Sequence, residues 1–382
     1  MRSLHLRALL VTAVLATPAL GQGPPTAVLG EPAPQPPPIF DINDPLRTIA
    51  DPLRTLGPPD QPFRPFAPLG PPACPAAEGI GTRFGMGILI GKYGVPGYGL
   101  MWIPAQRVAG QPTDLGVLRQ DLSLFAPIYR DGPDTAAVGL GIRNSIFSTD
   151  AILPTSGRSF PSTLWDIEAG VAYAHQWDNG WTTGAVVSAG SASDKPFTEG
   201  NTLVASLAVY NAFPTVGRDA WIVGISYSPT SDFPYPLPIV SYYWEPSDNL
   251  QMNIGLPFFV KWRFLPEWVF DGLWIPIRSV SAKVTWDTAE LGGARPYVAF
   301  DWANESYFLA DRPNNDFRFY SYEKRLYGGV TLDLPYRLRL DLSAGYAFDR
   351  FYFQGKTYKD RNLDRVNVGS GPFFAIQLRL QF

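Results

Sequence analysis

The stretch Pro372–Phe382, PFFAIQLRLQF, alternates between apolar and polar side chains as far as the final residue of the sequence. Successive side chains of an extended strand lie on opposite faces, so this alternation gives one apolar face and one polar face. Such a strand suits a β-barrel with lipid outside and water inside. The alternative is the last strand of a soluble β-sandwich. The apolar face carries Phe374, Ile376, Leu378, Leu380 and Phe382.

The composition of the whole chain favours the barrel over other membrane or nucleic-acid-binding classes. Aromatic residues make up 14% of the 382 residues, with 11 Trp and 18 Tyr, and mean hydropathy is only −0.04. A chain of low hydropathy that is rich in Trp and Tyr fits a barrel with aromatic girdles at both interfaces. Beyond the N-terminus no apolar stretch approaches the roughly 18 residues of a membrane helix. The net charge of −3 argues against nucleic-acid binding.

The N-terminus predicts export. Arg2 and Arg7 precede a short apolar run, and Ala19-Leu20-Gly21 offers small residues for cleavage. We therefore expect residues 1–21 to be a signal peptide. The single cysteine, Cys74, lies far from this site, so neither a lipoprotein anchor nor an intrachain disulfide is expected.

Residues 22–78 are crowded with proline and predict an extended, disordered periplasmic arm. The sequence DPLRT occurs in it twice, at 44–48 and 51–55. The repeat is typical of a low-complexity tether, and the alternatives are a short helical turn or a docking peptide. The sequence leaves open whether this arm plugs the lumen.

Residues 79–382 predict an antiparallel up-and-down barrel of about 14 strands, within a range of 12–16. The first strand is either continuous or a hairpin broken at 94–97. The expected strands are 86–103, 117–129, 136–147, 164–177, 181–192, 202–212, 219–228, 238–244, 249–261, 275–287, 295–304, 322–334, 338–350 and 372–382.

The predicted connections alternate in length. Those after the even strands are short and rich in turn residues, as in Asn179-Gly180, whereas most of those after the odd strands are long. The segment 262–274 is expected to be one of the long loops. Short periplasmic turns on one rim and long loops on the other are typical of a bacterial outer-membrane barrel.

Two segments, PIVSYYWEPSDNLQMNIGLPFFVKW near 238–262 and FDWANESYFLAD at 300–311, resemble an uncharacterised family of outer-membrane β-barrels of Gram-negative-type bacteria. The resemblance covers about residues 80–382 and implies a barrel in the outer membrane without an established activity. Outer-membrane barrels also share the terminal alternation that ends on an aromatic residue. This implies that the barrel-assembly machinery recognises Phe374, Ile376, Leu378, Leu380 and Phe382.

Charged residues on the polar faces of the expected strands predict the lining of the lumen. Both signs occur in comparable numbers, which favours cross-strand pairing over a selectivity filter of one sign. Asp166 and Glu168 project from the same side of one strand, about 7 Å apart. That spacing also suits acid–base chemistry, although a polar lining is the simpler reading. The predicted lining is Arg119, Asp121, Arg143, Asp166, Glu168, Lys283, Asp301, Asp333, Arg339, Asp341 and Arg379.

Motifs for catalysis, cofactors and metals are not found in the sequence. Apart from His5 in the signal peptide, His175 is the only histidine, and it shares an apolar face with Trp165 and Trp177. It lacks the serine motif that a lipid-hydrolysing enzyme needs. The loop from Asp311 to Asp316 lacks the ligand spacing of a calcium site. We therefore expect no enzyme activity, no cofactor and no metal.

Three functional hypotheses follow. The first is a narrow pore or transporter for small or apolar solutes. The second is an outer-membrane anchor whose proline-rich arm contacts a periplasmic or cell-wall partner. The third is a lipid-modifying enzyme that depends on His175. The expected partners are outer-membrane lipid, the assembly machinery and a possible periplasmic protein, with no nucleic acid.

Overall fold

The computed structural model describes residues 96–231, 235–312 and 314–380. The predicted signal peptide, the proline-rich arm, the start of the first expected strand and Phe382 lie outside the described residues. Apart from three short 3-10 turns, every regular element of the described part is a strand.

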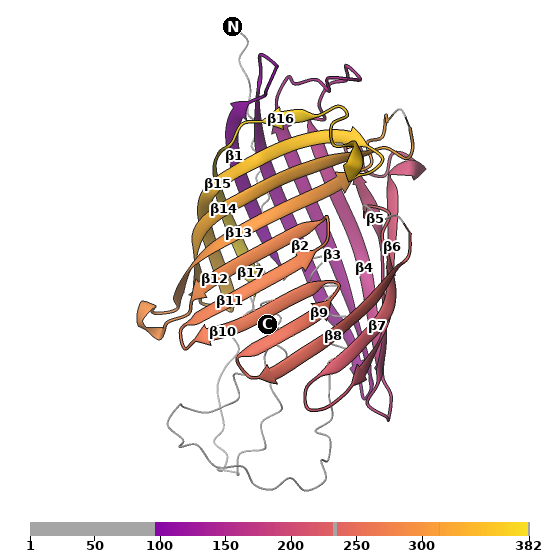
Figure 1. Ribbon diagram of the computed structural model, residues 1–382, viewed down its shortest axis with the longest axis vertical. Coiled ribbons are helices and arrows are strands. Elements are labelled where there is room, and N and C mark those ends of the chain that lie inside the picture. Colours follow the sequence, from indigo (N-terminus) through magenta and orange to yellow (C-terminus); the bar gives the residue numbers. More distant parts are fainter. Residues whose placement is uncertain (1–95, 232–234, 313, 381–382) are drawn as a thin grey trace, which may run out of the picture. The chain divides into compact units, whose positions relative to one another are not determined.

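The strands form one antiparallel sheet that closes on itself (Figure 1). Each strand from β1 to β15 pairs with the next along the chain, and β17 pairs with both β15 and β1, which closes the ring. The remaining strand of the 17, β16, is only three residues long and pairs along β15. The ring therefore has sixteen strands, which confirms the all-β barrel and lies at the upper end of the predicted range.

The strand bounds are β1 Gly97–Arg107, β2 Asp114–Asp131, β3 Asp134–Ser148, β4 Thr163–Gln176, β5 Thr182–Ser193, β6 Leu203–Pro214, β7 Ala220–Tyr227, β8 Leu237–Ser247, β9 Leu250–Gly255, β10 Phe258–Leu265, β11 Trp268–Ile275, β12 Ser279–Trp286, β13 Ala294–Tyr307, β14 Arg318–Leu334, β15 Leu338–Gly355, β16 Val366–Val368 and β17 Gly371–Leu380.

The two additional strands lie where the sequence predicted one strand and a long loop. The expected strand 249–261 is divided into β9 and β10 by a turn at 256–257. The expected loop 262–274 holds the end of β10, a turn at 266–267 and most of β11. The prediction was wrong here because Ile254-Gly255-Leu256-Pro257-Phe258 is almost wholly apolar. Only Gly255 and Pro257 mark the turn, and the apolar residues around them continue the pattern of a strand.

The connections still divide the barrel into two rims. We call the end with the connections 108–113, 149–162, 194–202, 228–236, 308–317 and 356–370 the long-loop rim, and the opposite end the short-turn rim. The long-loop rim is at the top of Figure 1. Two of its connections, 256–257 and 276–278, are nevertheless as short as turns.

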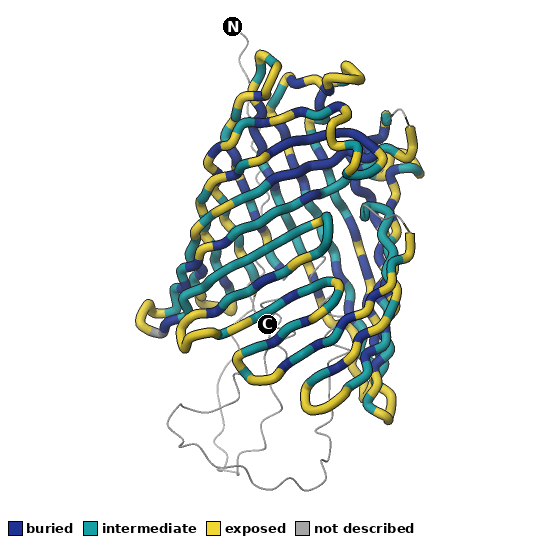
Figure 2. The backbone as a smooth tube through the Cα atoms, in the orientation of Figure 1, coloured by how far each residue is buried: buried dark blue, intermediate teal, exposed yellow. Residues whose placement is uncertain are grey.

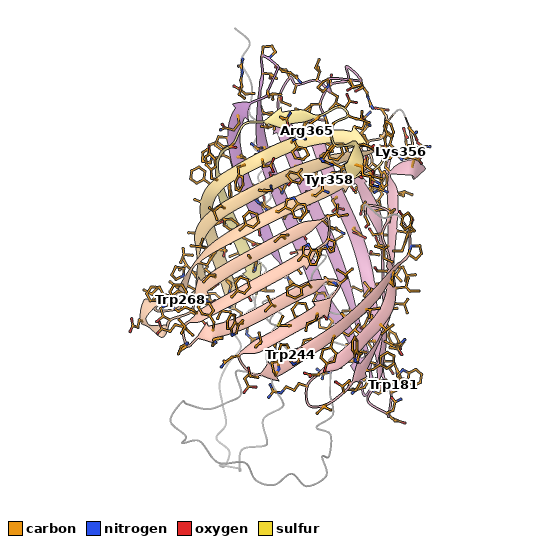
Figure 3. The ribbon with its side chains drawn as sticks, viewed as in Figure 1. Trp181, Trp244, Trp268, Lys356, Tyr358 and Arg365 are labelled. Atoms are coloured by element: carbon orange, nitrogen blue, oxygen red, sulfur yellow. The ribbon has the colours of Figure 1, made fainter. Side chains whose placement is uncertain are left out.

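Apolar side chains cover the outer face of the wall. On β4 the exposed side chains Val171 and Tyr173 alternate with the buried Ala172 and Ala174. Exposed tryptophans follow the short-turn rim from strand to strand, as expected at a membrane interface. Figure 3 labels the exposed Trp181 and Trp268 of this belt and the half-buried Trp244, and the belt also includes Trp177, Trp221 and Trp262.

No helix in the described ranges is long and apolar enough to cross a membrane.

The interior near the long-loop rim is filled by an apolar core. Its fully buried members come from many strands and include Ile103, Leu115, Leu164 and Phe319. The loop 149–162 adds Phe160, whose ring packs edge-on against Phe147, Phe319 and Tyr352 at centroid distances of 5.0–5.4 Å. Figure 2 shows buried residues concentrated where β14 and β15 approach this rim. In the described residues this end of the lumen is therefore packed like a protein core.

A direct contact between β13 and β5 explains how side chains can fill so large a ring. Phe308, just after β13, donates its backbone N–H to the carbonyl of Ala192 in β5 over 2.7 Å. Together with the strand pairing, this contact closes a smaller ring of nine strands, β1–β5, β13–β15 and β17, within the ring of sixteen. A ring of about eight strands has an interior that side chains just fill.

Glycine allows close packing between β14 and β15. A Cβ atom at Gly345 would overlap the Cα and Cβ atoms of Tyr327 on the neighbouring strand. By contrast, a Cβ at Gly99 in β1 would meet its nearest neighbours at 3.7 Å or more. Gly345 therefore has a steric role that Gly99 lacks.

We predict that Gly345→Ala forces β14 and β15 apart and costs about 1–3 kcal/mol in the free energy of unfolding. Gly99→Ala, the matched control, should change it by less than about 0.5 kcal/mol. Urea unfolding of the refolded barrel, followed by tryptophan fluorescence, measures both. Equal effects of the two substitutions would contradict the close-packing argument.

Candidate functional site

A network of buried charges lies in the lumen below the apolar core. Arg119 of β2 reaches across to Glu323 of β14 at 3.5 Å and to Glu305 of β13 at 3.7 Å. The side chains of Arg119 and Glu323 are only 8% and 3% exposed. Strands far apart in the sequence are thus tied together through the barrel interior.

The network extends toward β3 and β4 through Arg143. This guanidinium lies 2.5 Å from Asp121 on the neighbouring strand and 2.6 Å from Glu305. Glu305 also accepts a hydrogen bond of 3.0 Å from the hydroxyl of Tyr307. Glu305 therefore joins two arginines and a tyrosine from three strands.

Glu323 occupies the centre of the other half of the network. Besides Arg119, it lies 3.7 Å from Arg325 and 3.9 Å from Arg350. Arg325 also approaches Asp301 at 3.4 Å. One carboxylate therefore faces three guanidinium groups in an interior where an unpaired charge is costly.

The sequence predicted part of this network and missed the rest. It placed Arg119, Asp121, Arg143 and Asp301 in the lumen but omitted its other members. Glu323 and Arg325 share a face with the predicted Asp333, so strict alternation along β14 would have found both. Glu305 was missed because the expected strand ended at 304. The missed residues are Glu305, Glu323, Arg325 and Arg350.

The sequence did not predict Arg350 as a lumen residue, because the alternation of inward and outward side chains is interrupted within β15. The pairing with β14 shifts between Tyr322 and Lys324, and Asp349 has a positive φ of 49°. This bulge turns Arg350 inward, and Asp349 pairs at 2.7 Å with the outward-facing Lys324. Strict alternation from the predicted Asp341 would place Asp349 on the lumen face and Arg350 outside.

The remaining predicted lining residues lie lower in the barrel or in a pocket described below, and several pair across strands. Asp333 accepts hydrogen bonds from Arg295 at 2.6 Å and Arg339 at 2.9 Å. The ammonium group of Lys283 lies 4.4 Å from the ring centroid of Tyr297, whose hydroxyl donates to Asp341 over 2.7 Å. Arg379 donates to Gln377, Glu168 is 7% exposed, and Asp166 borders the pocket.

We predict that Glu323→Gln, which leaves three arginines facing a neutral group, lowers the free energy of unfolding by about 3–5 kcal/mol. Lys324→Gln, which removes the partly exposed pair with Asp349 on the outer face, should cost at most about 1 kcal/mol. Both values come from urea unfolding of the refolded barrel. A cost for Glu323→Gln no larger than that of the control would contradict a structural role for the network.

A second feature of the wall is a section of short strands. Strands β9–β12 have 6, 8, 8 and 8 residues, whereas β4 has 14 and β15 has 18. At a rise of about 3.3 Å and a tilt of about 40°, eight residues cover about 20 Å of height, whereas the apolar band of an outer-membrane barrel is about 25 Å tall. Because Trp262 and Trp268 hold the lower ends of these strands at the short-turn rim, the upper ends stop inside the band. We call this step in the wall the notch.

The turns at the top of the notch have the composition expected for an apolar layer. Leu256 and Trp274 are exposed, and the turn after β11 continues with Pro276 and Ile277. The turns at the lower ends of the same section instead contain Asp248, Glu267 and Asp287. A polar turn facing lipid would leave backbone and side-chain groups without water, so apolar turns suit this position.

Above the notch, the wall closes through a set of contacts that we call the seam. Ser306 donates its hydroxyl to the carbonyl of Thr230 at 2.7 Å, and Arg318 donates to the carbonyl of Ser231. Asn304 contacts the turn after β11, because its backbone N–H donates to the carbonyl of Arg278 at 2.8 Å. The loop after β7 thereby reaches β13 and β14 directly, across the tops of β8–β12.

A small polar pocket lies at the seam, with a volume of about 40 Å³. Two of its lining residues, Arg143 and Glu305, belong to the buried charge network. Asn304 is 6% exposed, and its side-chain oxygen has no hydrogen-bond partner in the described part of the chain. The pocket therefore lies between the seam and the buried charge network. Its lining is Arg143, Asp166, Ala192, Thr230, Arg278, Asn304, Glu305, Ser306 and Tyr307.

The loops beside the seam are joined by an exposed ion pair. Lys195, after β5, lies 2.5 Å from Asp311, after β13. The hydrogen bond and charge of Lys195 hold the pKa of Asp311 below its ordinary value, and the same contact raises the pKa of Lys195. Nearby, Ala310 donates its backbone N–H to Asp194 over 2.8 Å.

The depressed pKa of Asp311 predicts a pH dependence of the loops. The contribution of the pair to loop order is present above the ordinary carboxylate pKa of about 4 and is lost as the pH falls through the lower pKa of the folded state. We expect Asp311→Asn to expose the loop 308–317 to proteolysis at neutral pH, and the wild type to match it only in strong acid. The measurement is the cleavage rate by a protease that is active at both neutral and acid pH. Equal cleavage rates of the wild type at neutral pH and in strong acid would contradict the prediction.

Other candidate groups from the sequence lie on the outer face. His175 places its Nδ1 2.8 Å from Asp134, which also accepts a hydrogen bond from Tyr173, and its ring lies edge-on to Trp177 at 4.6 Å. In the described ranges no group of three or more His, Cys, Asp or Glu residues is arranged to hold a metal ion. The described members of the terminal apolar set, Phe374, Ile376, Leu378 and Leu380, are 37–51% exposed.

The sequence matches no protein-family model and no curated protein. The chain is similar to the β domain of the Bordetella autotransporter BrkA, with 11% identity and a TM-score of 0.29 over 75% of this chain and 99% of that one. It is also similar to a TodX monoaromatic hydrocarbon channel, with 11% identity and a TM-score of 0.29 over 75% of this chain and 88% of that one. The resemblance to an uncharacterised barrel family stays a prediction.

Proposed function

We propose that this protein is an outer-membrane barrel that passes small apolar solutes sideways through the notch in its wall. The outer face supports the membrane location, because an apolar band is bordered by a tryptophan belt and the opposite face of strands such as β2, β14 and β15 carries charged side chains. The uneven rims support the orientation, with the long loops facing outward.

The proposal rests on two observations. The lumen is filled, and strands β9–β12 are too short to cross the apolar band. In the described residues, the apolar core and the Arg119–Glu323–Glu305 network close the barrel axis near the long-loop rim. Hydrated ions have no wide path there. At the notch, by contrast, the strands end at the depth of the lipid chains, where Leu256 and Trp274 are exposed, and above them only the contacts of the seam close the wall.

The small size of the polar pocket indicates that the seam is closed in this structure. A volume of about 40 Å³ holds a water molecule or two rather than a drug-sized ligand, which usually needs about 300 Å³ or more. We therefore expect the seam to open as an apolar solute enters from the lipid side. The loop contacts Ser306–Thr230 and Lys195–Asp311 are the connections that such opening would break.

The first test is the conductance of the refolded mature protein in a planar bilayer, with and without residues 22–78. We expect no steady ohmic steps from either form. Steps from both forms would establish an aqueous pore and overturn the lateral route. Steps only after truncation would show that the arm blocks an axial path, and would equally contradict the closure that we infer from the barrel.

The second test measures entry of an apolar dye, N-phenylnaphthylamine, into Gram-negative cells that produce the protein. We predict that Ser306→Trp, which fills the pocket at the seam, reduces the protein-dependent uptake rate about tenfold. Ala169→Trp, which adds the same ring to the lipid-facing side of β4, should leave it unchanged. Heat-modifiable mobility on gels checks that both variants are folded.

The alternative to transport is the anchoring hypothesis, which predicts a different set of results. If the wild type neither conducts ions nor increases dye entry, transport is ruled out for these solutes. Capture of a cell-wall or periplasmic partner by residues 22–78 alone would then favour an anchor. The absence of enzyme activity, recognition by the assembly machinery and export by residues 1–21 remain predictions.

A further inference from the structure

An aromatic cluster lies on the outer face of the wall at the long-loop rim. Tyr320 stacks on Phe353 with a centroid distance of 4.4 Å, and Tyr322 stacks on Phe351 at 4.3 Å. All four side chains are at most 7% exposed although they point away from the lumen. They are buried because the loop 356–370 folds back over the outside of the barrel, with Tyr358 packed against Tyr322 and Phe353 at 6.0 Å.

The loop that covers this cluster carries several cations. Arg365 holds its guanidinium 3.8 Å from the ring centroid of Phe351, and Arg361 lies 5.3 Å from that of Tyr358. Lys359, two residues before Arg361, is exposed. Figure 3 labels Lys356, Tyr358 and Arg365 on this part of the barrel. Stacking on aromatic rings fixes a guanidinium plane and leaves its edge N–H groups for a ligand.

The carboxylates of the same loop are used internally. Asp360 accepts hydrogen bonds from the backbone N–H groups of Lys356 at 2.9 Å and Thr357 at 3.0 Å. Asp364 is 8% exposed and accepts from the backbone of Thr155 and Ser156 at 2.6 and 2.7 Å. Among the described residues, no carboxylate lies within ion-pair distance of Lys359, Arg361 or Arg365. Arg365 donates its Nε–H to the side chain of Asn367 at 2.6 Å, which leaves its two terminal nitrogens for a ligand.

The height of these cations on the wall indicates which layer of the membrane they contact. Along the outer face of β14, the exposed apolar Leu326 is followed two residues higher by Lys324 and then by the aromatic cluster. The apolar band therefore ends just below the loop. With the long loops facing outward, this level is the headgroup layer of the outer leaflet.

We propose that Arg361 and Arg365, with Lys359 beside them, bind the phosphate groups of a phosphorylated glycolipid in the outer leaflet. Planar guanidinium groups recognise phosphate through paired N–H contacts. The aromatic cluster holds the loop against the barrel, so the cations are already in position when the lipid binds. This inference depends on the membrane location but not on the lateral transport route.

The experiment measures binding of bis-phosphorylated lipid A, and of its dephosphorylated form, to the refolded mature protein by native mass spectrometry. We expect Arg361→Gln/Arg365→Gln to weaken binding of the phosphorylated lipid at least tenfold. Arg130→Gln/Arg337→Gln, which removes two exposed cations at the short-turn rim, should have no effect. The single variant Lys359→Gln, whose side chain packs on no ring of the cluster, should weaken binding less.

Three results would overturn the proposal. They are equal binding of the dephosphorylated lipid, unchanged binding in the Arg361/Arg365 variant, and displacement of the lipid by millimolar inorganic phosphate, which would indicate a site for free anions. If the double variant does not fold, as judged by heat-modifiable mobility, the result for Lys359→Gln decides, and unchanged binding then counts against the proposal. Dye uptake should be unaffected in all these variants, which separates this site from the notch.

Discussion

The contact between the end of β13 and β5 is the constraint on which the rest of this barrel depends. A ring of sixteen strands is wide enough for a large lumen, yet the hydrogen bond from Phe308 to Ala192 brings two distant parts of the wall together near one rim. Above this contact, only part of the ring continues upward. The apolar core lies in the narrow section that this contact closes, and the seam adds a second contact to β13, from the loop after β7.

The buried charges follow from the same geometry. Where the ring is narrow, side chains from β2 and from β13 and β14 come within reach of one another, and Arg119 can meet both Glu305 and Glu323. In a wide, water-filled lumen these groups would be solvated and only weakly coupled. Here their desolvation is offset by several partners for each charge, so the network helps to hold the narrow section in one arrangement.

The two faces of the wall carry separate roles at the long-loop rim. The inner face excludes ions through packing and paired charges. On the outer face, the loop 356–370 covers stacked rings and presents cations toward the headgroup layer. A bulge at Asp349 allows both, because it changes which residues of β15 face inward and so sends Arg350 into the lumen and Phe351 outside.

Much of the fold could be read from local patterns. Alternation within a strand depends only on the two-residue period of extended backbone, and so the class of fold and the inward direction of Arg119, Asp166 and Asp341 follow from sequence. The same rule failed at Arg350, where the bulge breaks the period. It also failed near Leu256 and Pro257, where an apolar turn resembled a continuous strand.

By itself, the sequence determined that residues with an apolar face and a polar face would form a barrel wall, because each strand carries that information locally. Only the tertiary structure decided how far each strand rises and which strands meet across the ring. Those properties depend on contacts such as Phe308 with Ala192 and Ser306 with Thr230, between residues more than seventy positions apart. The closed core, the notch and the outward-facing cations all arise from such long-range contacts, which no local period encodes.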